Sequence, residues 1–405
     1  MLYPLHEFQR AFLEPWRLLA EFGADAYANP FSPLAYVPSS HKYAAGFELL
    51  LRITQRYGKP EFGIDSVIVA KREVPVHEQV VASKPFCRLL HFVKPGVLNQ
   101  SKVLVVAPLS GHYATLLRDT VRTMLCDHEV YITDWKDARD IPFSEGPFHF
   151  DDYVAYVQEF IRLLGPDVHV ISVCQPTVPV LAAVSLLAAQ GDPRQPRTMI
   201  MMGGPIDTRN SPTDVNTFAK HRPISWFEQH VIQRVPTKYP GAMRRVYPGF
   251  LQWSGFVAMN PGRHVDSHWD FYEHLVAGDG ESADAHKRFY DEYNAVMDLP
   301  AEYYLETVRM VFQEHALPSG TMRVAGELVE PARIRKTALF SIEGELDDIS
   351  GVGQTEAAHG LCSGIPAARK KHLLAKDVGH YGIFSGRKYR EVIYPQVREF
   401  IRKHS

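Results

Sequence analysis

The stretch from His169 to Gln190 constrains the fold of this chain more than any other. It begins with a short β-branched apolar run, His169-Val-Ile-Ser-Val173, which is typical of a buried parallel strand. It ends with an Ala/Leu/Val segment from Val180 that predicts a buried helix. Cys174 lies between strand and helix, with no room for a loop. A turn this tight projects its central side chain above the sheet, as in a nucleophile elbow.

This turn matches the usual elbow pattern only in part. The common form is Gly-x-Ser-x-Gly, whereas here Ser172 and Pro176 replace the two glycines and Cys174 replaces the serine. Pro176 suits the first turn of a helix, where its missing N–H costs nothing. Cys174 is therefore either a nucleophile or a small buried apolar side chain, and the segments that follow favour the nucleophile.

Short apolar strands alternate with helices on both sides of this stretch. The other strands begin at Lys102, Glu129, Thr198, Thr337 and Lys371. Such alternation predicts an α/β fold, with a mainly parallel sheet and helices on both faces. Three shorter alternating runs between residues 66 and 94 predict antiparallel strands at an edge of that sheet.

We divide the chain into an N-terminal helical extension (1–64), a core in two parts (65–208 and 337–405) and an insertion (209–336). The insertion is irregular and rich in aromatic residues. Its position between two strands predicts a cap, or lid, over the carboxyl edge of the sheet, where open α/β sheets bind ligands. The residues that we assign to substrate binding there are Trp226, Tyr247, Phe250 and Trp253. Core packing is the alternative role for each of them.

The N-terminal extension opens with an amphipathic helical stretch. The apolar residues that recur at helical spacing are Leu5, Phe8, Phe12, Trp16 and Leu19. Pro15 predicts a kink or a division of this helix. The apolar face either packs on the core or on a second subunit, which leaves a homodimer open, or it adsorbs to an apolar surface.

Composition and charge argue against several classes of protein. A net charge of −2 favours no nucleic-acid partner, and 45% apolar content is that of an ordinary globular protein. No run approaches the ~20 apolar residues that span a bilayer, so we expect no transmembrane segment. Early charged residues argue against a signal peptide. Four widely spaced cysteines show no metal-ligand pairing, so we expect free thiols, no metal, no cofactor and a cytoplasmic location.

A thiol nucleophile needs a base within hydrogen-bond reach, and the base needs an acid to orient it. In a sheet of this kind the partners follow later strands in the chain order nucleophile, acid, base. The chain has Gly-Glu-Leu-Asp347 after one strand and Gly-His380 after the last. We therefore assign Asp347 as the acid and His380 as the base. Asp348 and Asp207 are the alternatives for the acid.

An oxyanion hole needs two backbone N–H groups directed at the developing charge. One is expected from Gln175, directly after the nucleophile. The second is expected from the loop Pro108-Leu-Ser-Gly-His112, where Leu109 or Ser110 is the donor because Pro108 has no N–H. His112 either contacts substrate or is a loop histidine without a chemical role.

Several segments together resemble the intracellular polyhydroxybutyrate depolymerases. They are His169–Leu181, Pro108–His112, Glu343–Gly351, Gly379–Gly386, Leu5–Arg10 and Arg245–Phe250. The resemblance covers essentially the whole chain. It implies an α/β-hydrolase fold in which Cys174 is the nucleophile, Asp347 the acid and His380 the base. The implied substrate is the amorphous polyester of 3-hydroxybutyrate in cytoplasmic storage granules, cleaved to oligomers and monomer.

Two other functions remain open. Polyester synthases also resemble this sequence and share the cysteine elbow, so the first alternative is an acyltransferase, or thiolysis to a coenzyme A thioester. Those enzymes usually carry glycine where this chain has Pro176, which favours the depolymerase. The second alternative is a non-enzymatic protein of the granule surface. The complete set of cysteine, aspartate and histidine argues against it.

Overall fold

The computed structural model describes residues 2–259 and 261–405, and in these ranges eight strands form the central sheet, in the order β15-β14-β8-β7-β5-β6-β4-β3. Their bounds are β3 (His77–Ser83), β4 (Cys87–Val93), β5 (Lys102–Val106), β6 (Glu129–Trp135), β7 (His169–Val173), β8 (Thr198–Met202), β14 (Ala338–Gly344) and β15 (Lys370–Ala375). β4 runs antiparallel to β3 and β6, and every pairing from β6 to β15 is parallel. Only the strands β5 and β6 exchange places relative to chain order, which is the arrangement of the α/β-hydrolase fold.

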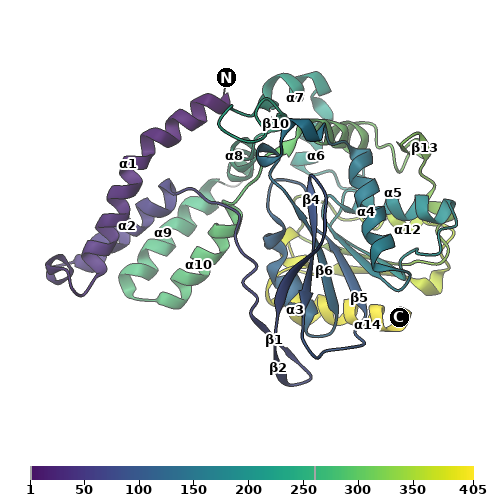
Figure 1. Cartoon of the computed structure of the whole chain (residues 1–405), viewed down its shortest axis with the longest axis horizontal. Helices are drawn as coiled ribbons and strands as arrows, with labels where there is room; N and C mark the ends of the chain where they lie inside the picture. Colours follow the sequence, from purple (N-terminus) through teal and green to yellow (C-terminus); the bar gives the residue numbers. More distant parts are fainter. Residues whose placement is uncertain (1, 260) are drawn as a thin grey trace.

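Helices cover both faces of this sheet (Figure 1). α4 (Phe150–Leu164) packs on α5 (Thr177–Ala189) on one face. On the other, α3 (Arg118–Leu125) is joined to the C-terminal helices by an ion pair between Asp119 and Arg390 and by a hydrogen bond from Tyr394 to Asp127, both 2.7 Å. α5 is apolar all round and almost wholly buried, as expected for a helix in the centre of a core.

The segment between β8 and β14 holds the insertion. It contains α6 (Asp214–His221), α7 (Ile224–His230), α8 (Gly249–Met259), α9 (Pro261–Ala277), α10 (Gly280–Tyr293) and α11 (Ala301–Thr307). Its short strands are β9 (Gln233–Arg234), β10 (Arg245–Tyr247), β11 (Leu299–Pro300), β12 (Arg323–Val324) and β13 (Glu327–Leu328). β10 pairs with β9 and β11 in a small antiparallel sheet beside the core.

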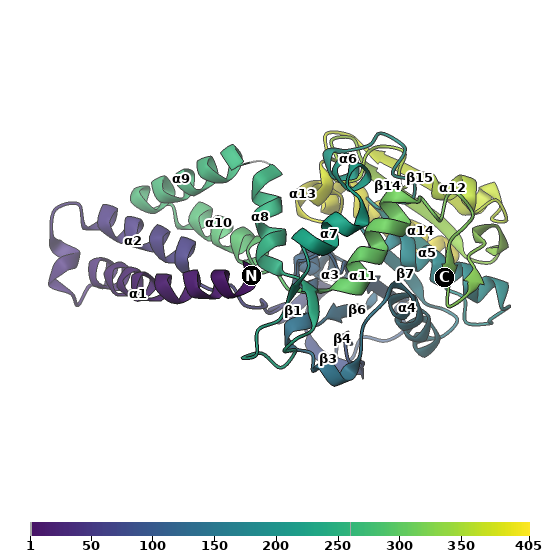
Figure 2. The same cartoon turned by 90° about the horizontal axis from the view of Figure 1, so that it is seen from above.

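Two helices of the insertion do not cover the sheet. α9 packs on α10 and on α2 (Ser40–Thr54), and α2 packs on α1 (Leu2–Ala28). Figures 1 and 2 show these four helices side by side, projecting from the core, and we call them the arm. α9 and α10 thus extend into the arm, and the cap role expected for residues 209–336 stays a prediction. α9 packs on both α10 and α2, whereas α10 packs on α9 and contacts the core at Ala114–Leu117.

The N-terminal helix is also more regular than its sequence suggests. α1 runs without a break through Pro15, so the predicted division there is wrong. Its second half is held by close packing on α2, where Gly23 faces the Phe47 ring. A Cβ on Gly23 would lie 2.6 Å from that ring, so only glycine permits this approach of the two helices.

The predicted edge strands divide into two groups. β3 and β4 join the main sheet, but β1 (Ser66–Val69) and β2 (Arg72–Pro75) pair only with each other. Ala70 and Lys71 both have positive φ, 48° and 66°, which is the backbone of a tight two-residue hairpin turn. This turn folds β1 directly back on β2. Among the described helices none is long and apolar enough to cross a bilayer.

Candidate active site

Cys174 occupies the sharp turn between β7 and α5. Its φ is +66°, in the left-handed region that side chains rarely adopt. Its N–H donates to the carbonyl oxygen of Met202 on β8 at 2.7 Å, and its carbonyl oxygen accepts from the N–H of Thr177 at 3.2 Å. These bonds hold the strained backbone, and strain of this kind gathers at functional positions. The half-buried thiol is thus presented at the carboxyl end of the sheet.

Two adjacent glycines make room for this turn. A Cβ on Gly204 would lie 1.8 Å from Oγ1 of Thr177, in the first turn of α5. A Cβ on Gly203, whose φ is +58°, would lie 3.3 Å from both the Asp347 carboxylate and the His380 ring. The end of β8 therefore passes directly beside these side chains, and both glycines are required there for steric reasons.

Asp347 and His380 meet in the loops after β14 and β15. Nδ1 of His380 and Oδ2 of Asp347 are 2.8 Å apart, and both side chains are buried. Oδ1 of Asp347 accepts from the N–H groups of Ile349 and Ser350, at 2.9 and 2.8 Å. The carboxylate is thus fixed by its own loop and directs its free oxygen at the imidazole.

The two alternative acids are engaged elsewhere. Asp348, next along the chain, has an exposed side chain. Asp207 forms an ion pair with Arg209 at 2.8 Å, and this hydrogen-bonded guanidinium holds the pKa of Asp207 below its usual range. Neither carboxylate has a hydrogen bond to His380 within the described residues.

The pKa of His380 is set by opposing effects. Burial disfavours the charged imidazolium, but the charge of Cys174, with hydrogen bonds to Asp347 and to the Cys174 sulfur, raises the pKa to about 10. A thiolate and an imidazolium stabilise each other in such a pair. Asp347 and Cys174 together therefore favour a proton on His380 at neutral pH.

The backbone around Cys174 offers donors for an oxyanion. Among the residues that the structure describes, no hydrogen bond uses the N–H of Gln175, Leu109 or Ser110. The loop that carries Leu109 is held at both ends. The carbonyl oxygen of Ala107 accepts from the indole of Trp135 at 2.9 Å, and that of Gly111 accepts from the N–H of Met297 at 2.7 Å.

His112 lies at the contact between this loop and the insertion. Its ring stacks on Phe256 with centroids 4.9 Å apart, and its Nε2 is 3.1 Å from the carbonyl oxygen of Tyr293. Burial lowers its pKa to about 4, so the ring is neutral at physiological pH. These contacts attach α8 and α10 to the core loop.

The four aromatic residues assigned to substrate binding contact other parts of the insertion and the arm. Trp226 stacks on His230, Tyr247 packs on Tyr304, Phe250 stacks on His6, and the Trp253 indole donates to Asn294 at 2.8 Å. In the described part of the chain no ring contact or hydrogen bond links any of the four to Cys174 or His380. Trp253 is 38% exposed, so part of its ring is open to a ligand.

Two tyrosines that sequence analysis did not single out border Cys174. Tyr303 of α11 is buried, stacks on Tyr153 at 5.3 Å, and has its hydroxyl against the side-chain amide of Gln175. Tyr381 follows His380. Burial raises the pKa of both hydroxyls, and the charge of Cys174 adds to the shift. No local signal marks Tyr303, because its partner Gln175 is 128 residues away.

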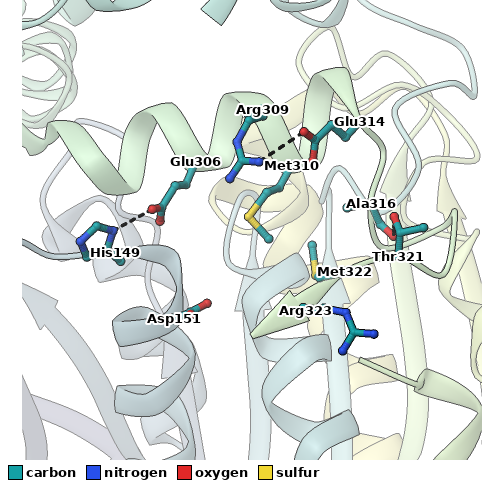
Figure 3. A pocket seen from close by; sticks show the side chains of 10 residues that line it. All are labelled: His149, Asp151, Glu306, Arg309, Met310, Glu314, Ala316, Thr321, Met322 and Arg323. Carbon is teal, nitrogen blue, oxygen red and sulfur yellow. Dashed lines mark hydrogen bonds and ion pairs between the residues drawn. The ribbon is translucent and has the colours of Figure 1, made fainter. Parts of the chain in front are cut away.

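Two surface hollows lie away from Cys174. One, of about 410 Å³, is lined by residues of α4, α11 and the segment after it. In Figure 3 its rim carries an ion pair between His149 and Glu306 at 2.7 Å and another between Arg309 and Glu314 at 3.3 Å. The other, of about 650 Å³, lies beside β3 and β4. Neither lining includes Cys174.

One group of side chains has the donor types of a metal site. Donor atoms of Glu343, Glu356 and His372 lie within 4.8 Å of one another. The buried Glu343 carboxylate, however, already accepts from the N–H groups of Gly353, Thr355 and Glu356, at 2.7–2.8 Å. These bonds close the loop that follows β14 and carries Asp347, and this structural role accounts for the cluster.

The strand order and the side chains gathered at Cys174 define an α/β-hydrolase with a candidate triad at the usual place. A family model described as "PHB de-polymerase C-terminus" matches residues 203–405, half of the chain, and the protein belongs to this family. The matched range includes Asp347 and His380. Family membership supports an ester hydrolase with a polymer substrate.

Some solved structures resemble this chain at low sequence identity. No curated protein matches the sequence. The lip1 protein of Acinetobacter baumannii is 9% identical, with 82% of this chain and 93% of that chain covered and a TM-score of 0.47. The monoacylglycerol lipase of Paleococcus ferrophilus is 12% identical, with 75% and 95% covered and a TM-score of 0.44. The fold assignment rests on the strand order itself.

Proposed function

We propose that this protein hydrolyses poly(3-hydroxybutyrate) through an acyl-cysteine intermediate, with Cys174 as nucleophile, His380 as base and Asp347 as acid. The observation that carries the proposal is the left-handed backbone of Cys174 beside the buried pair of Asp347 and His380. Family membership supports a polymer as the substrate. The elbow supports covalent catalysis by a thiolate, which is the reactive form of cysteine.

The first half of the reaction transfers the acyl group to sulfur. The Cys174 thiolate attacks the ester carbonyl, and the oxyanion is held by the N–H groups of Gln175 and of Leu109 or Ser110. As the tetrahedral intermediate collapses, the bond from the carbonyl carbon to the ester oxygen breaks. The imidazolium of His380 gives its proton to that oxygen, which leaves as a hydroxyl chain end.

The second half returns the enzyme to its starting state. Neutral His380 takes a proton from water as the oxygen of that water attacks the thioester carbon. The bond to sulfur breaks, and a carboxylic acid and the Cys174 thiolate remain, with the proton on His380. Asp347 keeps the ring in the tautomer that these steps need, because it accepts from Nδ1 throughout.

The insertion provides an apolar environment for the polymer. A 3-hydroxybutyrate chain is mostly CH₂ and CH₃ with regularly spaced carbonyls, so a groove lined by aromatic rings with few polar groups suits it. We propose that Tyr381 and the open part of Trp253 contribute to this groove, and that the buried Tyr303 supports the elbow through its contact with Gln175. Tyr247 stays a candidate, whereas the packing contacts of Trp226 and Phe250 favour structural roles. We place the enzyme at cytoplasmic storage granules, where this polymer is found.

The test is the release of 3-hydroxybutyrate from amorphous granules by wild type, Cys174→Ala and Cys174→Ser, with and without coenzyme A. We expect release by wild type without coenzyme A, and none by Cys174→Ala. Product that appears only as a coenzyme A thioester would favour the acyltransferase. Granule binding with no release by wild type would favour a non-enzymatic surface protein. Full activity of Cys174→Ala would refute the nucleophile.

A further inference from the structure

One face of α1 is apolar and largely exposed in the described chain. The residues that form it are Leu5, Phe8, Phe12, Trp16, Leu19 and Phe22, and we call them the α1 stripe. Their exposed fractions lie between 48% and 70%. At 3.6 residues per turn they fall within about 120° of one another. Contiguous exposed apolar surface of this kind marks an interaction site.

The charged side chains of α1 lie on its opposite side. Glu7, Arg10, Glu14, Arg17, Glu21 and Asp25 make up the charged residues of this helix. On the same helical projection they fall in the half turned away from the stripe. Arg17 forms ion pairs with Glu14 and Glu21, each at 2.9 Å, so these charges are also held together there. The stripe itself carries no charge.

The helix is fixed to the body of the protein and cannot easily turn the stripe inward. The Tyr3 hydroxyl donates to Oδ2 of Asp298 at 2.7 Å, and Glu7 accepts from the Tyr239 hydroxyl at 2.8 Å. Asp298 is also bonded to the core, because its N–H donates to Asp137 at 3.1 Å. The far half of α1 is packed on α2. The stripe therefore stays exposed, because these contacts hold α1 in its orientation.

We propose that the α1 stripe docks the enzyme on the neutral apolar surface of the polyester particle, an inference that rests on the proposed function. The net negative charge of α1 favours a neutral surface as the partner of the stripe. Four acidic residues against two basic ones oppose binding to an anionic phospholipid surface, which recruits basic helices. A polyester surface is uncharged and offers CH₂ and CH₃ groups to Phe and Trp rings.

Rigid attachment gives this docking a consequence for catalysis. Because α1 is bonded to the insertion through Tyr3 and Glu7, adsorption of the stripe fixes the orientation of the insertion at the particle surface. Polymer chains at that surface then meet the site in a limited set of orientations. Soluble esters reach Cys174 by diffusion and gain nothing from the stripe.

The experiment compares two triple variants, each made with and without Cys174→Ala. Phe8→Gln/Phe12→Gln/Phe22→Gln removes three exposed rings from the stripe. The matched control, Leu98→Gln/Phe143→Gln/Leu163→Gln, removes three apolar side chains that are 57–81% exposed on the core. Binding to protein-free amorphous polyester particles is measured by sedimentation in the Cys174→Ala background, where no polymer is consumed. The variants that keep Cys174 are used for two further measurements. These are the hydrolysis of the soluble 3-hydroxybutyrate trimer and the molar mass in solution.

We expect particle binding to fall at least tenfold for the stripe variant and less than twofold for the control, with trimer hydrolysis within twofold of wild type for both. Equal binding by the stripe variant and wild type would overturn the proposal. So would a wild-type dimer that the stripe variant converts to monomer while particle binding persists, because a second copy would then occupy the stripe. If wild type hydrolyses neither trimer nor polymer while its particle binding still depends on the stripe, the proposed function fails and the docking stands.

Discussion

Substitution of Asp347 by Asn separates the role of its charge from that of its shape. An Asn side chain keeps one oxygen, which can still accept from the N–H groups of Ile349 and Ser350. Its NH₂ group then faces Nδ1 of His380, where the carboxylate had accepted a hydrogen bond. Two donors cannot face each other, so the ring is forced into the tautomer that carries its proton on Nε2. That tautomer cannot accept a proton at Nε2.

The magnitude follows from the bond that is lost. A hydrogen bond to a charged partner contributes about 1.5–3 kcal/mol. At about 1.4 kcal/mol for each factor of ten, its loss alone lowers the rate about 10- to 150-fold. The wrong tautomer lowers it further. We therefore expect kcat of Asp347→Asn on the soluble 3-hydroxybutyrate trimer to fall at least about a hundredfold.

The pH dependence of the rate gives a second readout. Burial opposes the imidazolium in wild type, and Cys174 and Asp347 raise its pKa to about 10. Removal of the Asp347 charge therefore lowers this pKa. A group whose pKa is raised on folding stabilises the native protein below its ordinary value of about 6.5, and this stabilisation is lost as the pH rises toward 10. In Asp347→Asn both this loss and the alkaline fall in activity, which follows the loss of the proton from His380, move to lower pH.

The matched control is Asp348→Asn, which neutralises the exposed neighbouring carboxylate. We expect its kcat within twofold of wild type. The assay is steady-state hydrolysis of the trimer between pH 6 and 10.5, with thermal unfolding as a check on folding. If Asp347→Asn keeps its rate within threefold of wild type, or if Asp348→Asn loses as much, the assignment of the acid is refuted.

Three further changes test other parts of the site and the arm. Gly203→Ala places a Cβ where φ is +58°, so we expect a loss of about 1–3 kcal/mol in the free energy of unfolding by urea. As a control, Gly46→Ala lies in an open position of α2 and is expected to raise that free energy by up to about 1 kcal/mol. Tyr303→Phe removes the hydroxyl that accepts from the buried Gln175 amide, so we expect a loss of about 1–3 kcal/mol in the free energy of unfolding and a kcat about tenfold lower. An unchanged kcat would remove Tyr303 from the site. Burial lowers the pKa of His286 to about 4, below its unfolded value, so stability drops as the pH falls from about 6.5 toward 4. In His286→Gln we expect the melting temperature to depend less on pH between 6.5 and 4 than in wild type. An equal dependence would show that another group titrates.

The fold class could be predicted because its signals are local. Parallel strands buried on both faces give continuous apolar runs, and the runs at Lys102, His169 and Thr198 lie where β5, β7 and β8 begin. The meeting of Asp347 with His380 was also predictable. Carboxyl ends of parallel strands share one edge of a sheet, so loops after neighbouring strands converge although 33 residues separate these side chains.

The features that could not be predicted depend on contacts between distant segments. Pro15 removes one hydrogen bond from α1, but the helix continues because α2 supports it from the side. The apolar face of α9 was consistent with a cap, and periodicity does not show that its partner is α2. In the sequence nothing distinguishes Tyr303 from the other aromatic residues of the insertion, because its contact with Gln175 forms only in the folded chain.

The buried Asp298 connects α1 with the segment that leads to Tyr303. Asp298 accepts from the Tyr3 hydroxyl of α1 and from the N–H of Gly249 at the start of α8, at 2.7 and 2.8 Å. Its carbonyl oxygen accepts from the N–H of Ala138 in the core at 3.0 Å. A carboxylate this buried is retained only where its hydrogen bonds are satisfied, and here they join three separate segments. Three residues later in the chain α11 begins, and it carries Tyr303 to the elbow. α1 is therefore joined to the segment that leads into α11 by hydrogen bonds rather than by a flexible linker.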